Sequence, residues 1–283
     1  MPRNSVKKLS VEQQTTAPLQ QPQDNLQSIL GFVMPTTHVA LPSEGKFYPP
    51  NHPLHNCSEV EIKFLSAREL DVLTSKSLLK KGIAIERMLQ NILVDKSIVI
   101  DELLIGDKNA IIVAARAGTF GGDYEVRLQC QECDEFYEHV FDLSDVDTKN
   151  NDEVLDALEF SQNGTFFVTL PQTKVKVECR LLTSKDEKYL EERAKKKQKM
   201  GLPDSALTDH YKSFIVSLNG VTERGLVDEF VDVMPAGDLH FLNKEYTKVL
   251  PDVDMVQEST CTHCGSQNET SIPFTANFFW PDG

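Results

Sequence analysis

The chain has 283 residues, of which 40% are hydrophobic and 25% are charged. This length holds one large domain or two ordinary ones, whereas the longest apolar runs, such as AIIVAA at 110–115, are too short to span a bilayer. The net charge of −14 argues against a general phosphate-binding surface, and therefore against nucleic acid as the main partner.

The pattern divides the chain into three parts. Residues 1–35 are rich in Gln, Pro, Ser and Thr and lack sustained periodicity, so we expect a flexible leader, and its basic N-terminus lacks the apolar segment of a secretory signal. Residues 36–150 and 151–283 each combine alternating strands, several helices and one C-x-x-C turn. The predicted fold class is therefore α+β, with two units that follow the same order.

The first unit opens with an alternating strand, EVEIKF at 59–64, whose apolar residues share one side. A helix follows, because Ser66 and Glu69 have capping-box spacing and Gly82 provides a stop. After a second amphipathic helix, Asp107 is predicted as the N-cap of a mostly buried helix. Two alternating strands, DYEVRLQC and FYEHVFDL, then flank the first C-x-x-C turn.

The second unit repeats this order. The stretch GTFFVTLPQTKVKVEC predicts strands with a Leu-Pro bend, and a charged helix over 184–200 ends at Gly201. Further amphipathic helices are predicted at 205–218 and 223–234. Asp238 is predicted to cap the last helix, and a short strand leads to the second C-x-x-C turn and the C-terminal segment NETSIPFTANFFW.

A constant offset suggests that the two units are degenerate repeats. Asp107 and Cys130 lie 131 positions before Asp238 and Cys261 (238 − 107 and 261 − 130). Because two unlike features keep the same interval, we predict an internal duplication. The alternative is that similar capped helices recur without common origin. If the units are related by a pseudo-two-fold axis, their C-x-x-C turns can meet.

Four of the six cysteines lie in these two turns and are the candidate metal ligands. Two thiolates from each turn complete a closed tetrahedral site, typical of structural zinc, which would join the two units. Unmetallated thiol pairs, an iron–sulfur cluster, a redox C-x-x-C and replacement of one ligand by His263 remain alternatives. The predicted ligands are Cys130, Cys133, Cys261 and Cys264.

Other features carry weaker functional signals. The basic run RAKKKQKMG at 193–201 is interpreted as the solvated end of a helix, although a zinc-ribbon protein that binds nucleic acid remains the alternative function. No nucleophile elbow or catalytic carboxylate pair can be singled out, so we do not expect an enzyme. The aromatic C-terminal residues Phe278, Phe279 and Trp280 either pack back onto the chain or bind a partner, and we predict partner binding.

Four stretches resemble a known family: LPSEGKFYP, FLSARELDVLTS, GDYEVRLQCQEC and IPFTANFFWPDG. From about residue 36 onward, the chain is similar to the baseplate hub proteins of T-even-type contractile-tailed phages, which include a hub subunit and a hub assembly catalyst. The resemblance implies a non-enzymatic viral protein that helps build the central hub of the tail baseplate with other hub proteins. It implies assembly in the host cytoplasm and leaves open whether the protein stays in the virion.

Overall fold

The structure is a computed structural model that describes residues 33–149, 159–203, 205–272 and 276–279. Contacts divide the chain into residues 1–35 and residues 36–283, and the latter are called the main body below. The fold described below is that of the main body, and nearly all of the predicted leader lies outside the described residues. The main body contains both helices and small antiparallel sheets, which confirms the predicted α+β class.

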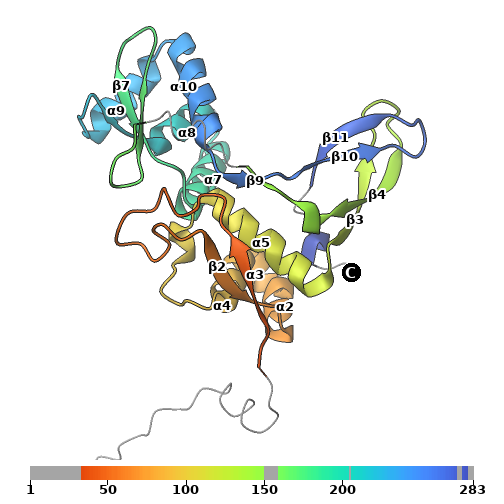
Figure 1. Cartoon of the computed structure of the whole chain (residues 1–283). Helices are drawn as coiled ribbons and strands as arrows, with labels where there is room; N and C mark the ends of the chain where they lie inside the picture. The colour runs from red at the N-terminus through yellow and green to blue at the C-terminus, as the bar shows by residue number, and fades with distance from the viewer. Residues whose placement is uncertain (1–32, 150–158, 204, 273–275, 280–283) are drawn as a thin grey trace, which may run out of the picture. The chain divides into compact units, whose positions relative to one another are not determined.

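The first part of the main body contains the strands and helices that its sequence predicts, except that one predicted helix is divided into two. The capping box of Ser66 and Glu69 is formed, but Ser75 is extended (φ −64°, ψ 108°) and separates two short helices, and Gly82 ends the second with φ 69°. The elements of this part (Figure 1) are β1 Thr36–Ala40, β2 Glu59–Lys63, α2 Ala67–Thr74, α3 Lys76–Lys81, α4 Ala84–Ile92, η1 Ile100–Glu102, α5 Ile105–Phe120, β3 Asp123–Gln129, β4 Phe136–Asp142, η2 Leu143–Asp145 and β5 Thr148–Lys149.

In the second part, the helix predicted at 205–218 is wrong over its last four residues. The chain leaves the helix after Phe214 because the β-branched pair Ile215 and Val216 extends a sheet. The elements are β6 Phe166–Thr169, β7 Lys176–Cys179, α7 Ser184–Lys199, α8 Ala206–Phe214, β8 Ile215–Leu218, α9 Arg224–Val233, α10 Ala236–Val249, β9 Asp252–Val253, β10 Val256–Thr260, β11 Gln267–Ser271 and η3 Ala276–Phe279.

The sheets are small and every strand pair is antiparallel. Strands β6, β7 and β8 form a three-stranded sheet, and each of the others has two strands: β1 with β2, β3 with β4, β10 with β11, and β5 with β9. The short β5–β9 pair matters for the site because Thr148 lies opposite Val253. The chain leaving the first hairpin thereby runs beside the chain entering the second.

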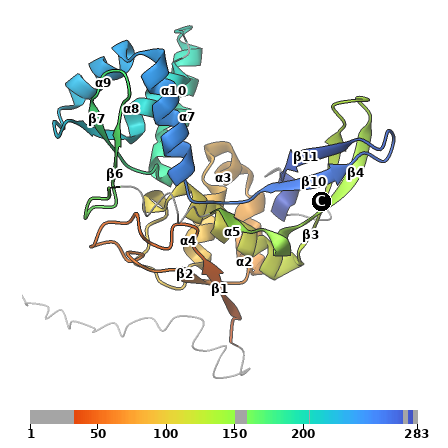
Figure 2. The ribbon, with the colours of Figure 1, turned by 45° about the horizontal axis from the view of Figure 1, so that its top comes forward.

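Most buried apolar residues of both parts belong to one hydrophobic cluster. Ile62 and Ile111 from the first part and Phe166 and Leu242 from the second are completely buried in it. Figure 2 shows α5 beside β2 and the segment that follows α10, and contacts join α5 to β2, α7 and β9. Within the described part of the chain, no helix combines the length and apolar character that crossing a membrane requires.

The predicted N-cap roles of Asp107 and Asp238 are wrong, and in the same way. Helix α5 begins at Ile105 and α10 at Ala236, so each aspartate is the third residue of its helix. Both side chains are fully buried and accept hydrogen bonds from a distant loop instead. Asp107 accepts from the Ser43 amide at 3.0 Å, and Asp238 accepts from the Gln172 amide at 2.8 Å.

Phe278 and Phe279, which the sequence analysis predicts as partner-binding residues, pack against their own chain. Both side chains lie in the main core, with 1% and 8% of their surface exposed. The Phe278 ring contacts Tyr124 edge to face at 5.1 Å, and its carbonyl accepts a hydrogen bond from Arg116 Nε at 2.6 Å. The aromatic tail therefore packs back onto its own chain at these residues, while Trp280 lies outside the described residues.

Replacing Phe278 with leucine should lower the free energy of unfolding by about 1–2 kcal/mol, because the ring contact with Tyr124 and part of the buried area are lost. Urea denaturation measures this change. Phe136→Leu is the matched control, because that ring is 48% exposed. An unchanged urea midpoint for Phe278→Leu would contradict a role in the core and would favour a contact with a partner.

Candidate metal centre

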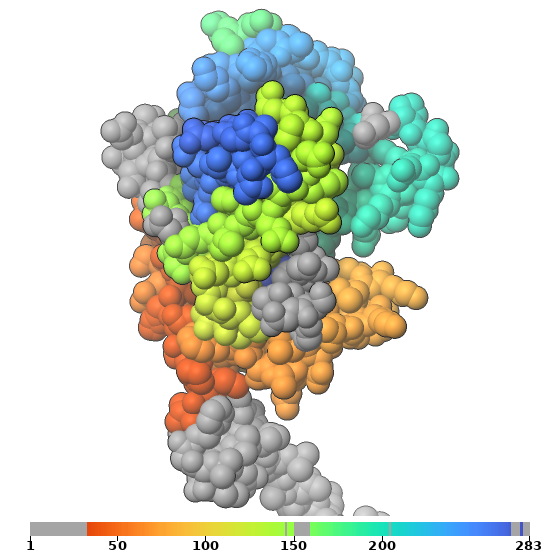
Figure 3. Space-filling model, turned by 90° about the vertical axis from the view of Figure 1, so that its right-hand side faces the viewer, coloured from red at the N-terminus to blue at the C-terminus, as the bar shows by residue number. Residues whose placement is uncertain are grey.

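Two β-hairpins carry the four predicted ligands. Strands β3 and β4 flank Cys130 and Cys133, and strands β10 and β11 flank Cys261 and Cys264. In the first hairpin the strands bury alternate residues: in β4, Tyr137 and Phe141 are buried while the residues between them are more exposed. Figure 3 shows the β10–β11 hairpin lying against the β3–β4 hairpin.

The two turns have the same backbone construction. In each, the first cysteine's carbonyl accepts a hydrogen bond from the residue four positions later, Asp134 N at 3.0 Å in one turn and Gly265 N at 2.9 Å in the other. These equivalent residues both have left-handed backbones, with φ 58° and 74°. Glycine adopts this conformation readily and aspartate tolerates it, so both sequences can close the same turn.

The geometry of the four sulfurs matches a tetrahedral metal site. The Cys130 and Cys264 sulfurs are 3.7 Å apart, and those of Cys133 and Cys261 are 3.8 Å apart. All four sulfurs lie within 4.8 Å of one another. A tetrahedron with metal–sulfur distances of about 2.3 Å has edges of about 3.8 Å, whereas a disulfide bond is about 2.05 Å long. These four cysteines could therefore hold a metal ion.

Polar contacts next to the cysteines also join the hairpins. The Tyr137 hydroxyl lies 2.9 Å from the Ser259 hydroxyl, and both residues are buried. The Gln257 side chain donates to the Asp142 carbonyl at 2.7 Å and accepts from the Asp142 amide at 3.2 Å. Such paired contacts fix the two hairpins in one register, so the sulfur donors are positioned by protein contacts as well as by any metal.

The electrostatics of the cluster favour a bound cation. Backbone N–H groups of Cys133 and Glu132 lower the pKa of the Cys130 thiol to about 7. The Glu135 N–H acts in the same direction at Cys133, but burial and the neighbouring thiols outweigh it and raise that pKa. Four thiolates at this spacing repel one another strongly unless a divalent ion lies between them.

The side chains of the remaining cysteines and of His263 supply no donor to this cluster. Cys179 is fully buried in the core, where burial raises the pKa of its thiol, and Cys57 contacts the carbonyl of Pro53. A ring nitrogen of His263 lies 3.2 Å from the Phe136 carbonyl, so this histidine is not one of the clustered donors. Each C-x-x-C motif lies in a hairpin turn, whereas the cysteine pair of a redox protein typically lies at a helix N-terminus, which lowers the thiol pKa.

The hairpins lie within a region that defines the family of the chain. The family model described as T4 bacteriophage base plate protein matches residues 34–280. The chain belongs to the T4 bacteriophage base plate protein family. The match includes both hairpins and all four clustered cysteines of this base plate protein. No curated protein and no solved structure matches the chain.

The structure gives a physical reason for the LPSEGKFYP stretch of this base plate protein. The Ser43 hydroxyl and the Tyr48 hydroxyl lie 2.6 and 2.8 Å from one carboxylate oxygen of Asp107. Gly45 has φ 72°, and a Cβ there would lie 2.3 Å from the Leu54 carbonyl. Sequence reasoning missed this cluster because Asp107 was assigned to its own helix. The polar residues Ser43 and Tyr48 within LPSEGKFYP were the only sign in the sequence that this loop binds a buried carboxylate.

Proposed function

We propose that this protein is a structural or assembly component of the central hub of the phage tail baseplate and acts through protein–protein contacts rather than catalysis. The family match over residues 34–280 is the observation that carries the proposal. The resemblance of its LPSEGKFYP and FFWPD stretches to hub proteins supports the finer assignment to the hub. A four-sulfur site without an open coordination position suits a structural role, because substrate cannot reach the metal.

We propose zinc as the metal and Cys130, Cys133, Cys261 and Cys264 as its ligands. Zinc prefers a tetrahedral thiolate set, and hairpin turns that each supply two cysteines are typical of zinc knuckles. The ligands come from segments up to 134 positions apart. The free energy of metal binding would therefore contribute directly to holding these segments together.

Metal analysis of the purified protein tests this assignment. We expect one zinc ion per chain, retained during gel filtration under reducing conditions and released by a strong chelator together with a fall in unfolding temperature. Iron in place of zinc would contradict the identity of the metal. Absence of any metal under reducing conditions would contradict the site.

The two predicted repeats, residues 36–150 and 151–283, remain a proposal that several parallels support. Each part runs from a hairpin through helices to a long helix with a buried aspartate in its first turn, and ends in a C-x-x-C hairpin. The capping box of Thr183 and Asp186 before α7 parallels that of Ser66 and Glu69 before α2. Superposition of an experimental structure of each part on the other would test common ancestry.

The alternative function, a zinc-ribbon protein that binds nucleic acid, draws on the basic run in α7. Two of its lysines already form ion pairs one turn apart, Lys195 with Glu191 at 2.9 Å and Lys196 with Glu192 at 3.8 Å. These exposed pairs fit a solvated helix surface. The net charge of −14 also opposes phosphate binding over the rest of the surface.

Co-purification separates the two functions. Tagged full-length protein, expressed with the other baseplate proteins of its phage, should retain at least one of them through a salt wash, with zinc present in the complex. DNA binding whose affinity falls steeply with salt, without capture of a baseplate protein, would support the alternative. Mass spectrometry of purified virions then distinguishes a resident of the tail baseplate from a factor that acts in the host cytoplasm during assembly.

A further inference from the structure

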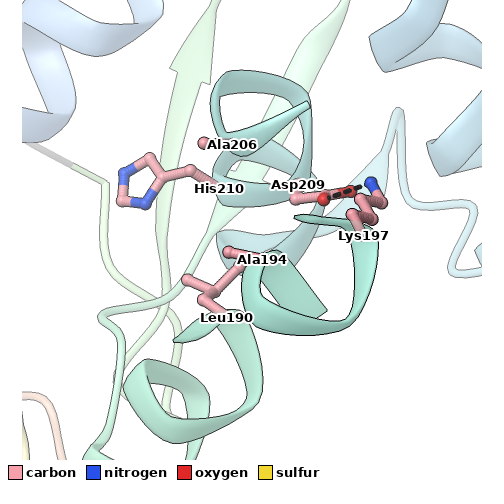
Figure 4. Close-up of a pocket in the computed structure, with 6 residues that line it drawn as sticks. All are labelled: Leu190, Ala194, Lys197, Ala206, Asp209 and His210. Atoms are coloured by element: carbon pink, nitrogen blue, oxygen red, sulfur yellow. Dashed lines mark hydrogen bonds and ion pairs between the residues drawn. The ribbon is translucent and has the colours of Figure 1, made fainter. Parts of the chain in front are cut away.

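Helices α7 and α8 enclose an apolar groove that the metal site does not use. Leu190 and Ala194 of α7 face Ala206 and His210 of α8 around a hollow of about 200 Å³. Figure 4 shows the Lys197–Asp209 ion pair at one end of the groove and the His210 ring at the other. The small side chains of the two alanines leave space in the groove, so an apolar side chain from outside can enter between the helices.

The rim of the groove carries an excess of cations together with exposed apolar residues. Five cationic residues lie between Arg193 and Lys199, and three acidic residues, Glu191, Glu192 and Asp209, pair with four of them, which leaves an excess of two positive charges. Beyond the end of α7, the Met200 and Leu202 side chains are exposed, as is Leu207 at the start of α8. A partner suited to this surface therefore presents an apolar ridge among acidic residues.

Helix α9 presents such a ridge on its outer face. Val227 and Val231 are buried beneath the helix, whereas Leu226 and Val233 are 44% and 72% exposed. These two side chains are seven residues apart, about two helical turns, so they lie along one side with Glu229 between them. The stretch 223–232 has four acidic residues against one arginine, which makes its charge opposite to that of the groove rim.

We propose that α9 of one copy of this protein docks in the α7–α8 groove of a second copy. Leu226 of the docked helix enters between Ala194 and Ala206, while Glu229 approaches the cations at the end of α7. The two surfaces are different patches of the same chain, so the contact is heterologous and each copy keeps one unused groove and one unused α9. Repetition of the contact produces a closed ring or an open chain of copies. This self-association is independent of whether the protein also binds other baseplate proteins.

Complementation between two disabled copies tests the contact directly. Ala206→Trp fills the groove but leaves α9 intact, and Leu226→Lys disables α9 but leaves the groove intact. In sedimentation velocity at low salt, wild-type protein should associate as its concentration rises, and each variant alone should associate at least tenfold more weakly. An equimolar mixture of the two variants should form a heterodimer and nothing larger, because it contains one functional groove and one functional α9.

A matched control keeps the outcome interpretable. Leu79 of α3 is 55% exposed, so Leu79→Lys makes the same change at a comparable surface position and should leave association at the wild-type level. Circular dichroism checks that every variant remains folded. A wild-type protein that stays monomeric at all concentrations overturns the proposal. So does association that neither variant weakens, or a mixture that fails to associate when wild type does.

Discussion

Replacing Cys130 with serine should reduce bound metal from one ion per chain to nearly none and should weaken the contact between the two hairpins. Serine keeps the size of the side chain but does not supply a thiolate, and three remaining sulfurs cannot close the tetrahedron. Structural zinc contributes on the order of 10 kcal/mol to small isolated zinc fingers. Here the Tyr137–Ser259 and Gln257–Asp142 contacts also join the hairpins, so we expect a loss of several kcal/mol.

Two other cysteines separate metal loss from general destabilisation. Cys57→Ser alters a partly exposed thiol outside the cluster and should leave both metal content and stability near wild type. Cys179→Ala removes a fully buried sulfur and should lower stability without lowering metal content. Metal analysis and urea denaturation on the same samples provide both readouts. If Cys130→Ser retains a full equivalent of metal, the four-sulfur site is wrong.

The convergence of the cysteines was predictable because two independent features shared one offset along the chain. The prediction rests on the equal offsets of Cys130 from Cys261 and of Asp107 from Asp238, whereas the duplication inferred from these offsets stays a prediction. The pairing of individual sulfurs, Cys130 with Cys264 and Cys133 with Cys261, was not predictable. Which sulfur of one turn approaches which sulfur of the other depends on the relative rotation of the two hairpins, and side-chain contacts such as Tyr137 with Ser259 set that rotation.

Local patterns failed where a distant contact outweighed them. The periodicity of FIVSL predicts a longer amphipathic helix, but Ile215 instead pairs with Cys179 at the edge of β7. Aspartate before an apolar run resembles an N-cap, but Asp107 is recruited by a loop 64 positions upstream. The aromatic tail resembles a partner-binding segment, but Phe278 contacts Arg116 and Tyr124 of its own chain. In each case the deciding group lies far away in sequence.

The buried pair Asp107 and Asp238 allows a second prediction in which one isosteric change has unequal effects. Asp107→Asn keeps a carbonyl for the Ser43 amide, but its NH₂ group faces the Ser43 and Tyr48 hydroxyls, which donate to the carboxylate in the wild type. These two O–H groups lose their acceptor, yet they can rotate away and accept from the NH₂ group, which a backbone N–H cannot do. Asp238 instead accepts from two backbone amides, Gln172 N on one oxygen and Thr173 N on the other. Asparagine there turns its buried NH₂ group toward one of these part-buried N–H groups, so two donors face each other without an acceptor.

We therefore expect a loss of about 1–2 kcal/mol for Asp107→Asn and a larger fall in urea midpoint for Asp238→Asn. Alanine at position 107 is the comparison that removes the acceptors altogether, and it should cost about 2–4 kcal/mol because several buried donors lose their partner. Equal urea midpoints for the two asparagine variants would contradict this reading of the hydrogen bonds.

The pH dependence of the two variants should have opposite signs. Burial raises the pKa of Asp107 despite the hydrogen bonds from Ser43, so the folded wild type binds a proton more tightly than the unfolded chain and loses stability as pH rises above about 4. Asparagine lacks this loss, so the stability of Asp107→Asn relative to wild type should rise with pH.

At Asp238, burial also opposes ionisation, but the Gln172 and Thr173 amides outweigh it and lower the pKa. The wild-type advantage over Asp238→Asn should therefore hold above about pH 4 and shrink as pH falls below that value. Urea midpoints of the three proteins between pH 3 and 8 decide the matter, and parallel curves for the two variants would contradict the assigned ionisation of these carboxyls.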